Sequence, residues 1–285
     1  MEYHSTKTGG KTLYVSDLDG TLLRRDETIS PYTAEIVNRL ADAGMLFSYA
    51  TARSYLTASK AAARITARIP VIVYNGAFIV DSRTQEKLFS NYFAEEDVIR
   101  IGAVLRQHTI DPIVYSIRDG AEKFTYCEQS VTKGMRFFLN GRKNDVRNHP
   151  AARQEEIYAG NVFYFSCIDE EERLKPVYEM LKGRYHCIFH RDIYSGEQWL
   201  EILPPQATKA NAVLQLKKML GADRVVSFGD GENDLSLFQV SDACYAVGNA
   251  VPALKACATA VIGSNADDGV AGWLASNVRI DCGAE

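Results

Sequence analysis

The chain has 285 residues, of which 46% are hydrophobic and 24% are charged, and its formal net charge is -4. This length is enough for one large or two moderate domains with a buried core. The negative balance argues against a nucleic-acid-binding protein, because such proteins use a basic excess to neutralise phosphates. No apolar run approaches the roughly 20 residues of a membrane span, and the N-terminus lacks the apolar region of a signal peptide. We therefore expect a cytoplasmic protein that binds neither nucleic acid nor membranes.

The first 80 residues alternate between strand and helix patterns. A β-rich run at Thr12–Ser16 is followed by a helical pattern that Ser30 can cap. A second apolar run, Met45–Ala50, is typical of a strand buried on both faces. A helical stretch over residues 54–67 leads to another strand at Val71–Tyr74. This alternation predicts a parallel sheet covered by helices.

The pattern changes from about residue 90 to about residue 203. Here we expect a helix, a hairpin at Arg118–Gly120, an irregular polar stretch, a strand at Val162–Cys167 and a charged helix. Two further strands are expected near Tyr185–Phe189 and Trp199–Leu203. The segment therefore resembles a separate α+β unit.

The alternation of strand and helix returns after this segment. A helix is expected at Thr208–Leu220 and a strand at Arg224–Phe228, followed by the polar loop Gly229–Asp234. The sequence thus predicts an α/β fold: a Rossmann-like, doubly wound parallel-sheet core split by an inserted α+β domain. The predicted boundaries are residues 1–89 and 204–285 for the core and 90–203 for the insertion.

Polar clusters follow the predicted core strands. Asp17 and Asp19 come after the first strand, Thr51 after the second, and Asp230 after a later one. In a doubly wound sheet, ligands bind beyond the carboxyl ends of the strands. We therefore expect these loops to converge on one site.

The acidic residues of these loops indicate a metal site. Asp17 and Asp19 are two residues apart, and Gly20 permits a tight turn after them. An EF-hand is excluded, because its twelfth position would be Thr28 instead of a glutamate. Carboxylates gathered in one pocket repel one another unless a cation lies among them. An oxygen-only site without histidine or cysteine favours Mg²⁺.

These residues match a known family in order and spacing. The segments Asp17–Leu22, Thr51, Lys209 and Gly229–Asp234 resemble the four motifs of the haloacid-dehalogenase (HAD) superfamily. The insertion between the second and third motifs resembles the C2B cap of the Cof-type, class IIB phosphatases. Three further segments resemble the same branch: Asn75–Ala77, Gly248–Ala250 and Asp268–Ala271.

The resemblance implies roles for the catalytic and metal-binding residues. Asp17 would be the nucleophile that attacks phosphorus, and Asp19 the general acid and base. Mg²⁺ would be held by Asp17, the backbone carbonyl of Asp19, and Asp230. Asp234 would lie behind these ligands and orient Lys209 or a metal-bound water. Because phosphonatases and dehalogenases of the superfamily lack an acid at the position of Asp19, phosphate-ester chemistry is favoured.

The resemblance also implies which groups bind the phosphate. They are the Thr51 side chain, the backbone amides of Leu18 and Ala52, Lys209, and Asn233. The chain departs from the family at two of these places: Ala52 and Ala210 stand where glycine is usual. If either position requires a positive φ, phosphate affinity falls.

The resemblance implies that the substrate is a small-molecule phosphate ester and that the cap selects it. A sugar phosphate is the expected class, and two alternatives stay open: a phosphotransferase similar to phosphomannomutases, and a non-catalytic phospho-ligand-binding protein. The cap residues that could contact the leaving group are basic or aromatic: Arg136, Arg142, Lys143, Arg147, His149, His190, Arg191, Tyr194 and Trp199.

Overall fold

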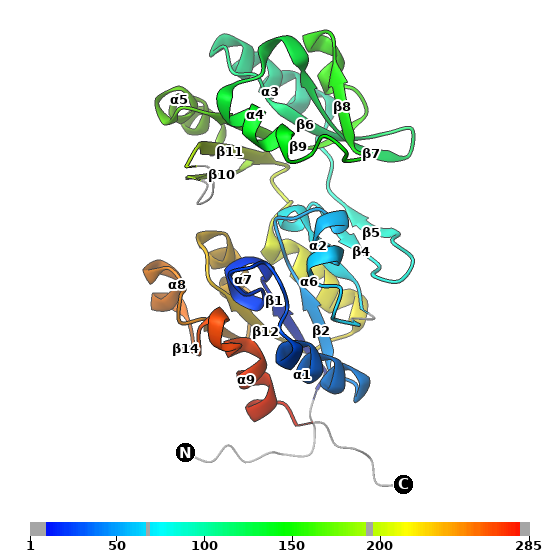
Figure 1. Cartoon of the computed structure of the whole chain (residues 1–285), viewed down its shortest axis with the longest axis vertical. Helices are drawn as coiled ribbons and strands as arrows, with labels where there is room; N and C mark the ends of the chain where they lie inside the picture. Colours follow the sequence, from blue (N-terminus) through cyan, green and yellow to red (C-terminus); the bar gives the residue numbers. More distant parts are fainter. Residues whose placement is uncertain (1–9, 67–68, 192–195, 280–285) are drawn as a thin grey trace. The chain divides into compact units, whose positions relative to one another are not determined.

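The computed structural model describes residues 10–66, 69–191 and 196–279. The chain divides into two compact units (Figure 1). The core unit consists of residues 1–90 and 208–285, and the inserted unit consists of residues 91–207. The predicted α/β fold with a parallel core sheet and an inserted domain is confirmed.

The core unit is built on a parallel sheet with the strand order β14-β13-β12-β1-β2. The central strand β1 pairs with β12 on one side and β2 on the other, so the strand order reverses beside it. Such a reversal opens a crevice at the carboxyl ends of the strands. The strands are β1 (Thr12–Ser16), β2 (Leu46–Tyr49), β12 (Arg224–Gly229), β13 (Ala243–Ala246) and β14 (Ala260–Val261).

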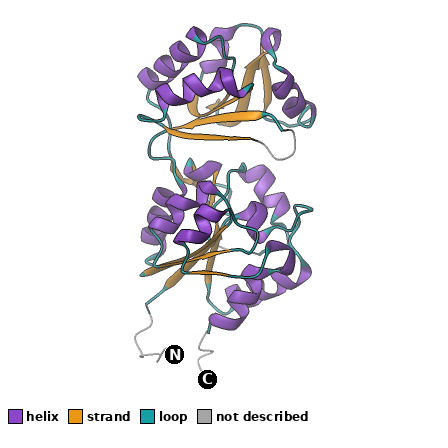
Figure 2. Cartoon of the chain, turned by 90° about the vertical axis from the view of Figure 1, so that its left-hand side faces the viewer, coloured by secondary structure: helices purple, strands orange, loops and turns teal. Residues whose placement is uncertain are grey.

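Helices cover both faces of this sheet (Figure 2). On one face, Leu13 and Val15 of β1 share a buried cluster with α6 and with Leu237 of α7. On the other, Trp273 of α9 stacks near Tyr14 and Phe228, and α1 packs beside α9. The helices are α1 (Pro31–Asp42), α2 (Tyr55–Ala61), α6 (Lys209–Leu220), α7 (Leu235–Gln239), α8 (Pro252–Cys257) and α9 (Gly269–Asn277).

A short antiparallel sheet accompanies the core. Its strands are β3 (Val71–Val73), β4 (Phe78–Val80) and β5 (Lys87–Ser90). We expected β3 to continue the parallel sheet; it meets that sheet in a parallel bridge between Ala50 and Ile72, but its ladder partner is β4, to which it runs antiparallel. The sequence pattern missed β4 and β5, because runs of three or four residues carry little periodicity.

The inserted unit is a mixed sheet with the order β10-β11-β9-β6-β7-β8. Helices α3 and α5 pack on one face, around Leu105, Phe165 and Val177. Helix α4 packs on the other face, where Phe138 stacks against Phe124 and Trp199. The elements are α3 (Glu95–Gln107), β6 (Ile113–Arg118), β7 (Ala121–Cys127), α4 (Lys133–Asn140), β8 (Asn148–Ala151), β9 (Asn161–Asp169), α5 (Glu171–Leu181), β10 (His186–Arg191) and β11 (Gln198–Leu203).

Two local expectations were wrong. The helical stretch expected to reach residue 67 ends at Ala61, because Asn38 of α1 hydrogen-bonds the backbone of Arg64 and Thr66 in a turn instead. The stretch expected to be irregular contains α4, capped by Thr132, and β8. Across the described residues, no helix combines the length and the apolar character that crossing a membrane requires.

Candidate active site

The first motif forms a tight turn at the carboxyl end of β1. The Asp17 amide donates to the Phe228 carbonyl (2.9 Å), so the motif is fixed to the end of β12. The turn η1 (Leu18–Leu22) follows and reverses the chain, with φ of 75° at Gly20. A Cβ atom at Gly20 would overlap the Asp230 carboxylate. Glycine is therefore required here both by the backbone angle and by the close approach of the fourth motif.

Lys209 joins the first and fourth motifs. It is the first residue of α6, and Thr208 caps this helix through the Asn211 amide. The Lys209 side chain is 1% exposed, and its Nζ donates to Asp17 Oδ1 (2.5 Å) and Asp234 Oδ1 (2.7 Å). One buried ammonium group therefore orients two carboxylates.

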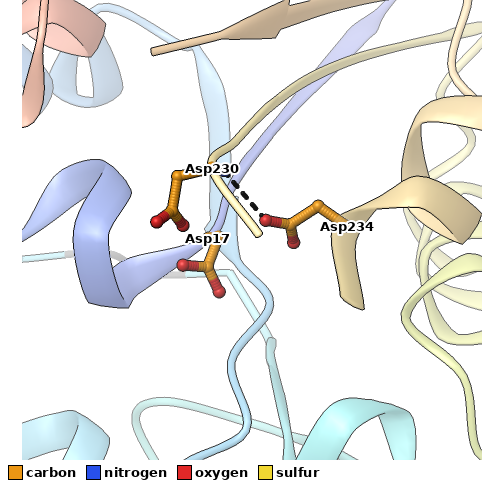
Figure 3. A group of neighbouring side chains, drawn as sticks. All are labelled: Asp17, Asp230 and Asp234. Carbon is orange, nitrogen blue, oxygen red and sulfur yellow. Dashed lines mark hydrogen bonds between the residues drawn. The ribbon is translucent and has the colours of Figure 1, made fainter. Parts of the chain in front are cut away.

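Three carboxylates gather around this contact (Figure 3). Oxygen atoms of Asp17, Asp230 and Asp234 all lie within 4.8 Å of one another. Asp230 Oδ1 accepts a hydrogen bond from Thr21 (3.0 Å). Asp234 Oδ2 accepts from the Asp230 and Gly231 amides (3.0 and 3.1 Å), while its Oδ1 accepts from Lys209. Both Asp234 oxygens are thus engaged by the protein.

The carboxylates hold more negative charge than Lys209 balances. Burial raises the pKa of Asp17 well above its ordinary value; Lys209 opposes this shift, and Asp234 and Asp230 add to it. Burial and the Asp234 charge raise the pKa of Asp230 to about 6. At Lys209, burial is outweighed by the two aspartates, and its pKa rises. The site therefore favours an additional cation.

A divalent ion fits this group of residues. The donors are carboxylate oxygens, without histidine or cysteine among the clustered residues, and hard oxygen donors suit Mg²⁺. Such an ion would offset the repulsion that raises the aspartate pKa values. HAD phosphatases use a divalent metal, and the aspartate cluster that could hold one is present.

The side chain of Asp19 points to a different partner. Arg53 Nε lies 2.8 Å from Asp19 Oδ2, and Arg53 Nη2 lies 2.5 Å from Oδ1. The same Nη2 also donates to Glu27 (2.6 Å). Arg53 thereby orients the candidate general acid in a forked ion pair. Sequence reasoning assigned no role to Arg53, although it follows directly after the second motif.

The predicted phosphate-binding groups lie on adjoining loops. Thr51 is fully buried, and its Oγ1 accepts from the Arg53 amide (3.1 Å). In the fourth motif, Asn233 Nδ2 lies 3.5 Å from Asn75 Oδ1. The backbone amide of Asn75 donates to the Thr51 carbonyl (2.9 Å). Leu18 opens the turn after Asp17 and is buried. The structure thus brings the four motif loops together.

The two alanine departures introduce no backbone strain. Among the described residues, the non-glycine positions with positive φ do not include Ala52 or Ala210. Ala210 lies within α6, where alanine is a favourable residue. Neither position therefore demands the glycine that is usual in the family.

A further motif supports the turn around Gly20. Asn249 Nδ2 donates to the Gly20 carbonyl (2.7 Å), and the Asn265 amide donates to Asn249 Oδ1 (3.0 Å). Asn265 Nδ2 donates in turn to the Leu23 carbonyl (2.9 Å). These contacts fix the chain at Gly20 and Leu23, directly after Asp19, and they give Asn249 of the segment Gly248–Ala250 a structural role.

The residues expected to contact a leaving group have varied environments in the inserted unit. Arg147 is buried between Glu122 and Asp145, and Arg142 stacks on Phe138. His190 stacks on Trp199, and Arg191 pairs with Glu171. The remaining candidates are exposed (Arg136, Lys143, His149) or lie outside the described residues (Tyr194).

Comparisons with known proteins agree with this geometry. The model of the haloacid dehalogenase-like hydrolases matches residues 14–274. A 5-amino-6-(5-phospho-D-ribitylamino)uracil phosphatase of Bacillus subtilis is 28% identical, over 90% of this chain and 95% of its own. An HMP-PP phosphatase of Serratia proteamaculans is 27% identical, over 84% of each chain. A haloacid dehalogenase-like hydrolase structure from Bacteroides thetaiotaomicron superposes with a TM-score of 0.76 at 23% identity, covering 94% of this chain and 100% of that one.

The chain belongs to the haloacid dehalogenase-like hydrolases, in the Cof-type, class IIB branch. It is a phosphoric monoester hydrolase. The predicted family and the predicted enzyme class are confirmed.

Proposed function

We propose that this phosphatase works through a covalent aspartyl-phosphate on Asp17, with Mg²⁺ as its metal. The observation that carries the proposal is the environment of Asp17. Its carboxylate is buried, held by Lys209 at 2.5 Å, and clustered with Asp230 and Asp234. A carboxylate fixed in this way is preorganised for in-line attack on phosphorus.

The reaction has two displacement steps. In the first, an Asp17 oxygen forms a bond to phosphorus, the bond to the ester oxygen breaks, and Asp19 gives its proton to the departing oxygen. In the second, Asp19 takes a proton from water, the water oxygen bonds to phosphorus, and the bond to Asp17 breaks. General acid and base assistance of this kind contributes roughly 10²–10⁴ in rate.

The remaining site residues bind charge. Mg²⁺ at Asp17, the Asp19 carbonyl and Asp230 would offset the repulsion between carboxylate and phosphate dianion. Thr51, the Leu18 and Ala52 amides, Lys209 and Asn233 are proposed to donate to the phosphoryl oxygens. The role of Asp234 is to orient Lys209, as its 2.7 Å contact to Nζ suggests.

For the substrate we propose a phosphorylated sugar or sugar alcohol. The relative from Bacillus subtilis that acts on a phosphoribityl compound supports this class. The inserted unit would choose among such esters, as caps do in this branch.

The test is hydrolysis of p-nitrophenyl phosphate by the purified chain with and without Mg²⁺. We expect activity that requires the metal and falls at least about 10³-fold in Asp17→Asn, which keeps the side-chain shape but is a poor nucleophile. Circular dichroism of the variant controls for folding. Full activity of folded Asp17→Asn would contradict the proposal.

Asp19→Asn tests the acid step separately. A p-nitrophenolate leaving group needs little protonation, whereas a sugar alkoxide needs a proton. We therefore expect a larger loss with a hexose phosphate than with p-nitrophenyl phosphate. Equal losses would argue against Asp19 as the acid. Analysis of the same reaction for hexose-phosphate isomers distinguishes hydrolysis from a phosphotransferase.

A further inference from the structure

The carboxamide of Asn75 is a buried polar group that the described residues hydrogen-bond only in part. Asn75 is 1% exposed, and its Nδ2 has no hydrogen-bond acceptor among the described residues. Its Oδ1 has a single long contact, 3.5 Å from Asn233 Nδ2. Because leaving a buried donor unsatisfied costs free energy, such a group in a native protein calls for a ligand or a water to complete it.

The backbone holds this carboxamide in place against a conformational cost. Tyr74 and Asn75 both have φ of 50°, in the left-handed region, which is unfavourable for the tyrosine and is tolerated better by the asparagine. The Tyr74 amide donates to the Arg53 carbonyl, and the Asn75 amide to the Thr51 carbonyl, both at 2.9 Å. Strain that is fixed by surrounding hydrogen bonds is typical of functional sites.

The turn η2 (Tyr74–Gly76) also contacts the third motif. A Cβ atom at Gly76 would overlap the Thr208 carbonyl, one residue before Lys209. The carboxamide of Asn75 therefore lies on a turn packed between the loops that carry Thr51, Lys209 and Asn233. These are the residues to which the proposed function assigns the phosphoryl oxygens.

We propose that Asn75 is a further phosphate-binding residue, whose Nδ2 donates a hydrogen bond to a non-bridging oxygen of the bound phosphoryl group. The inference rests on the proposed function and extends it. The contact to Asn233 holds the two carboxamides side by side, and the phosphate oxygen satisfies the donor that the protein leaves open. The ligand is an orthophosphate or phosphomonoester dianion.

The test measures binding of inorganic phosphate to the Mg²⁺-loaded full-length protein by calorimetry. Asn75→Gly removes the carboxamide and accepts the positive φ without strain, so its fold should be kept. Asn75→Asp keeps the shape but replaces the donor by a negative charge. Since a hydrogen bond to a charged group is worth more than one between neutral groups, we expect phosphate affinity to fall about 10- to 100-fold in Asn75→Gly and further in Asn75→Asp.

Asn277→Gly is the matched control. Asn277 Nδ2 donates to the Trp273 carbonyl at an exposed helix end, away from the motif loops, so phosphate affinity should be unchanged. Thermal unfolding without phosphate checks that the Asn75 variants are folded. A purely structural role would lower the unfolding temperature and leave the affinity as it is.

Each outcome decides the inference. Wild-type affinity in both folded Asn75 variants overturns it while the proposed function stands, provided that the wild-type protein hydrolyses p-nitrophenyl phosphate. Failure of the wild-type protein to bind phosphate overturns both. If wild type binds phosphate but does not hydrolyse the ester, the aspartyl-phosphate mechanism fails alone, and the loss of affinity in Asn75→Gly still supports Asn75.

Discussion

Each unit of the molecule contains a buried cation between two carboxylates, and the two groups differ in charge balance. In the core, Lys209 contacts Asp17 and Asp234. In the inserted unit, Arg147 contacts Glu122 at 2.8 Å and Asp145 at 2.7 Å. The distances are alike. A buried ion pair is therefore not by itself a sign of catalysis.

The pKa shifts separate the two groups. Burial pushes the pKa of Asp145 upward, but its hydrogen bonds to Arg147 outweigh burial and leave the pKa below its ordinary value. In the core, Lys209 does not overcome burial, and the pKa of Asp17 stays raised, with Asp230 as an additional acid. The group in the inserted unit is satisfied by the protein alone. The core group keeps an excess of negative charge that a bound metal ion would neutralise. Raised carboxylate pKa values of this kind are typical of functional sites.

Lys209→Met should have the largest effect. The variant leaves Asp17 and Asp234 buried without their cation, which costs about 3–5 kcal/mol of stability. Turnover of p-nitrophenyl phosphate should fall by about 10³-fold or more, because the Lys209 ammonium group orients Asp17 and is also proposed to bind the phosphoryl oxygens. Denaturant unfolding and steady-state kinetics measure the two effects. Near-wild-type turnover would show that the buried charge has only a structural role.

Arg147→Met is the corresponding change in the inserted unit. Removing the arginine takes the cation away from two partly buried acids, so we expect a loss of about 3 kcal/mol in unfolding free energy. Turnover per folded molecule should stay within about threefold of wild type, since Arg147 keeps the pKa of Asp145 low and this group needs no metal ion. A large fall in kcat at unchanged stability would contradict the distinction between the two groups and make Arg147 a substrate contact.

Gly20→Ala tests the close approach of the first and fourth motifs. The new methyl group would overlap the Asp230 carboxylate, and φ at this position is 75°. We expect the Mg²⁺ concentration for half-maximal activity to rise about tenfold or more, because displacing a ligand by 1 Å weakens a preorganised site. Gly221→Ala is the control: its φ is 60°, but nothing lies within 4 Å of its Cβ position. That variant should lose only about 1 kcal/mol of stability, with unchanged metal dependence.

The convergence of the first, second and fourth motif loops could be predicted because each follows a strand of one parallel sheet. Asp17 ends β1, Asp230 ends β12, and parallel strands align their carboxyl ends. The ion pair between Arg53 and Asp19 could not be predicted in this way. It joins side chains that are 34 positions apart in the sequence. A local sequence pattern does not determine which side-chain rotamers bring two such residues into contact.

The unexpected elements of the fold have a similar explanation. Helix α4 lies in a stretch rich in arginine, lysine and asparagine, and its formation depends on burying Met135, Phe138 and Leu139 against the sheet. Its local signals are the cap residue Thr132 and the helical spacing of these three apolar residues. Asn75 was recognised only as part of a segment that resembles the Cof-type branch; its unpaired Nδ2 becomes visible once the surrounding side chains are placed.

Glu201→Gln should have the smallest effect, and it extends the comparison to another acidic side chain of the inserted unit. Burial raises the pKa of Glu201 above its ordinary value of 4.5, while the His190 charge and a Tyr164 hydrogen bond oppose the shift. The folded state therefore keeps this proton to a higher pH than the unfolded chain does. Stability contributed by Glu201 falls as pH rises from about 4.5 through the folded pKa, by at most about 1.4 kcal/mol per pH unit.

Glutamine cannot titrate, so the stability difference between variant and wild type should grow over this range and then level off. Unfolding measured from pH 4 to pH 8 tests this, and a difference independent of pH would mean that Glu201 has the same pKa in the folded and the unfolded protein.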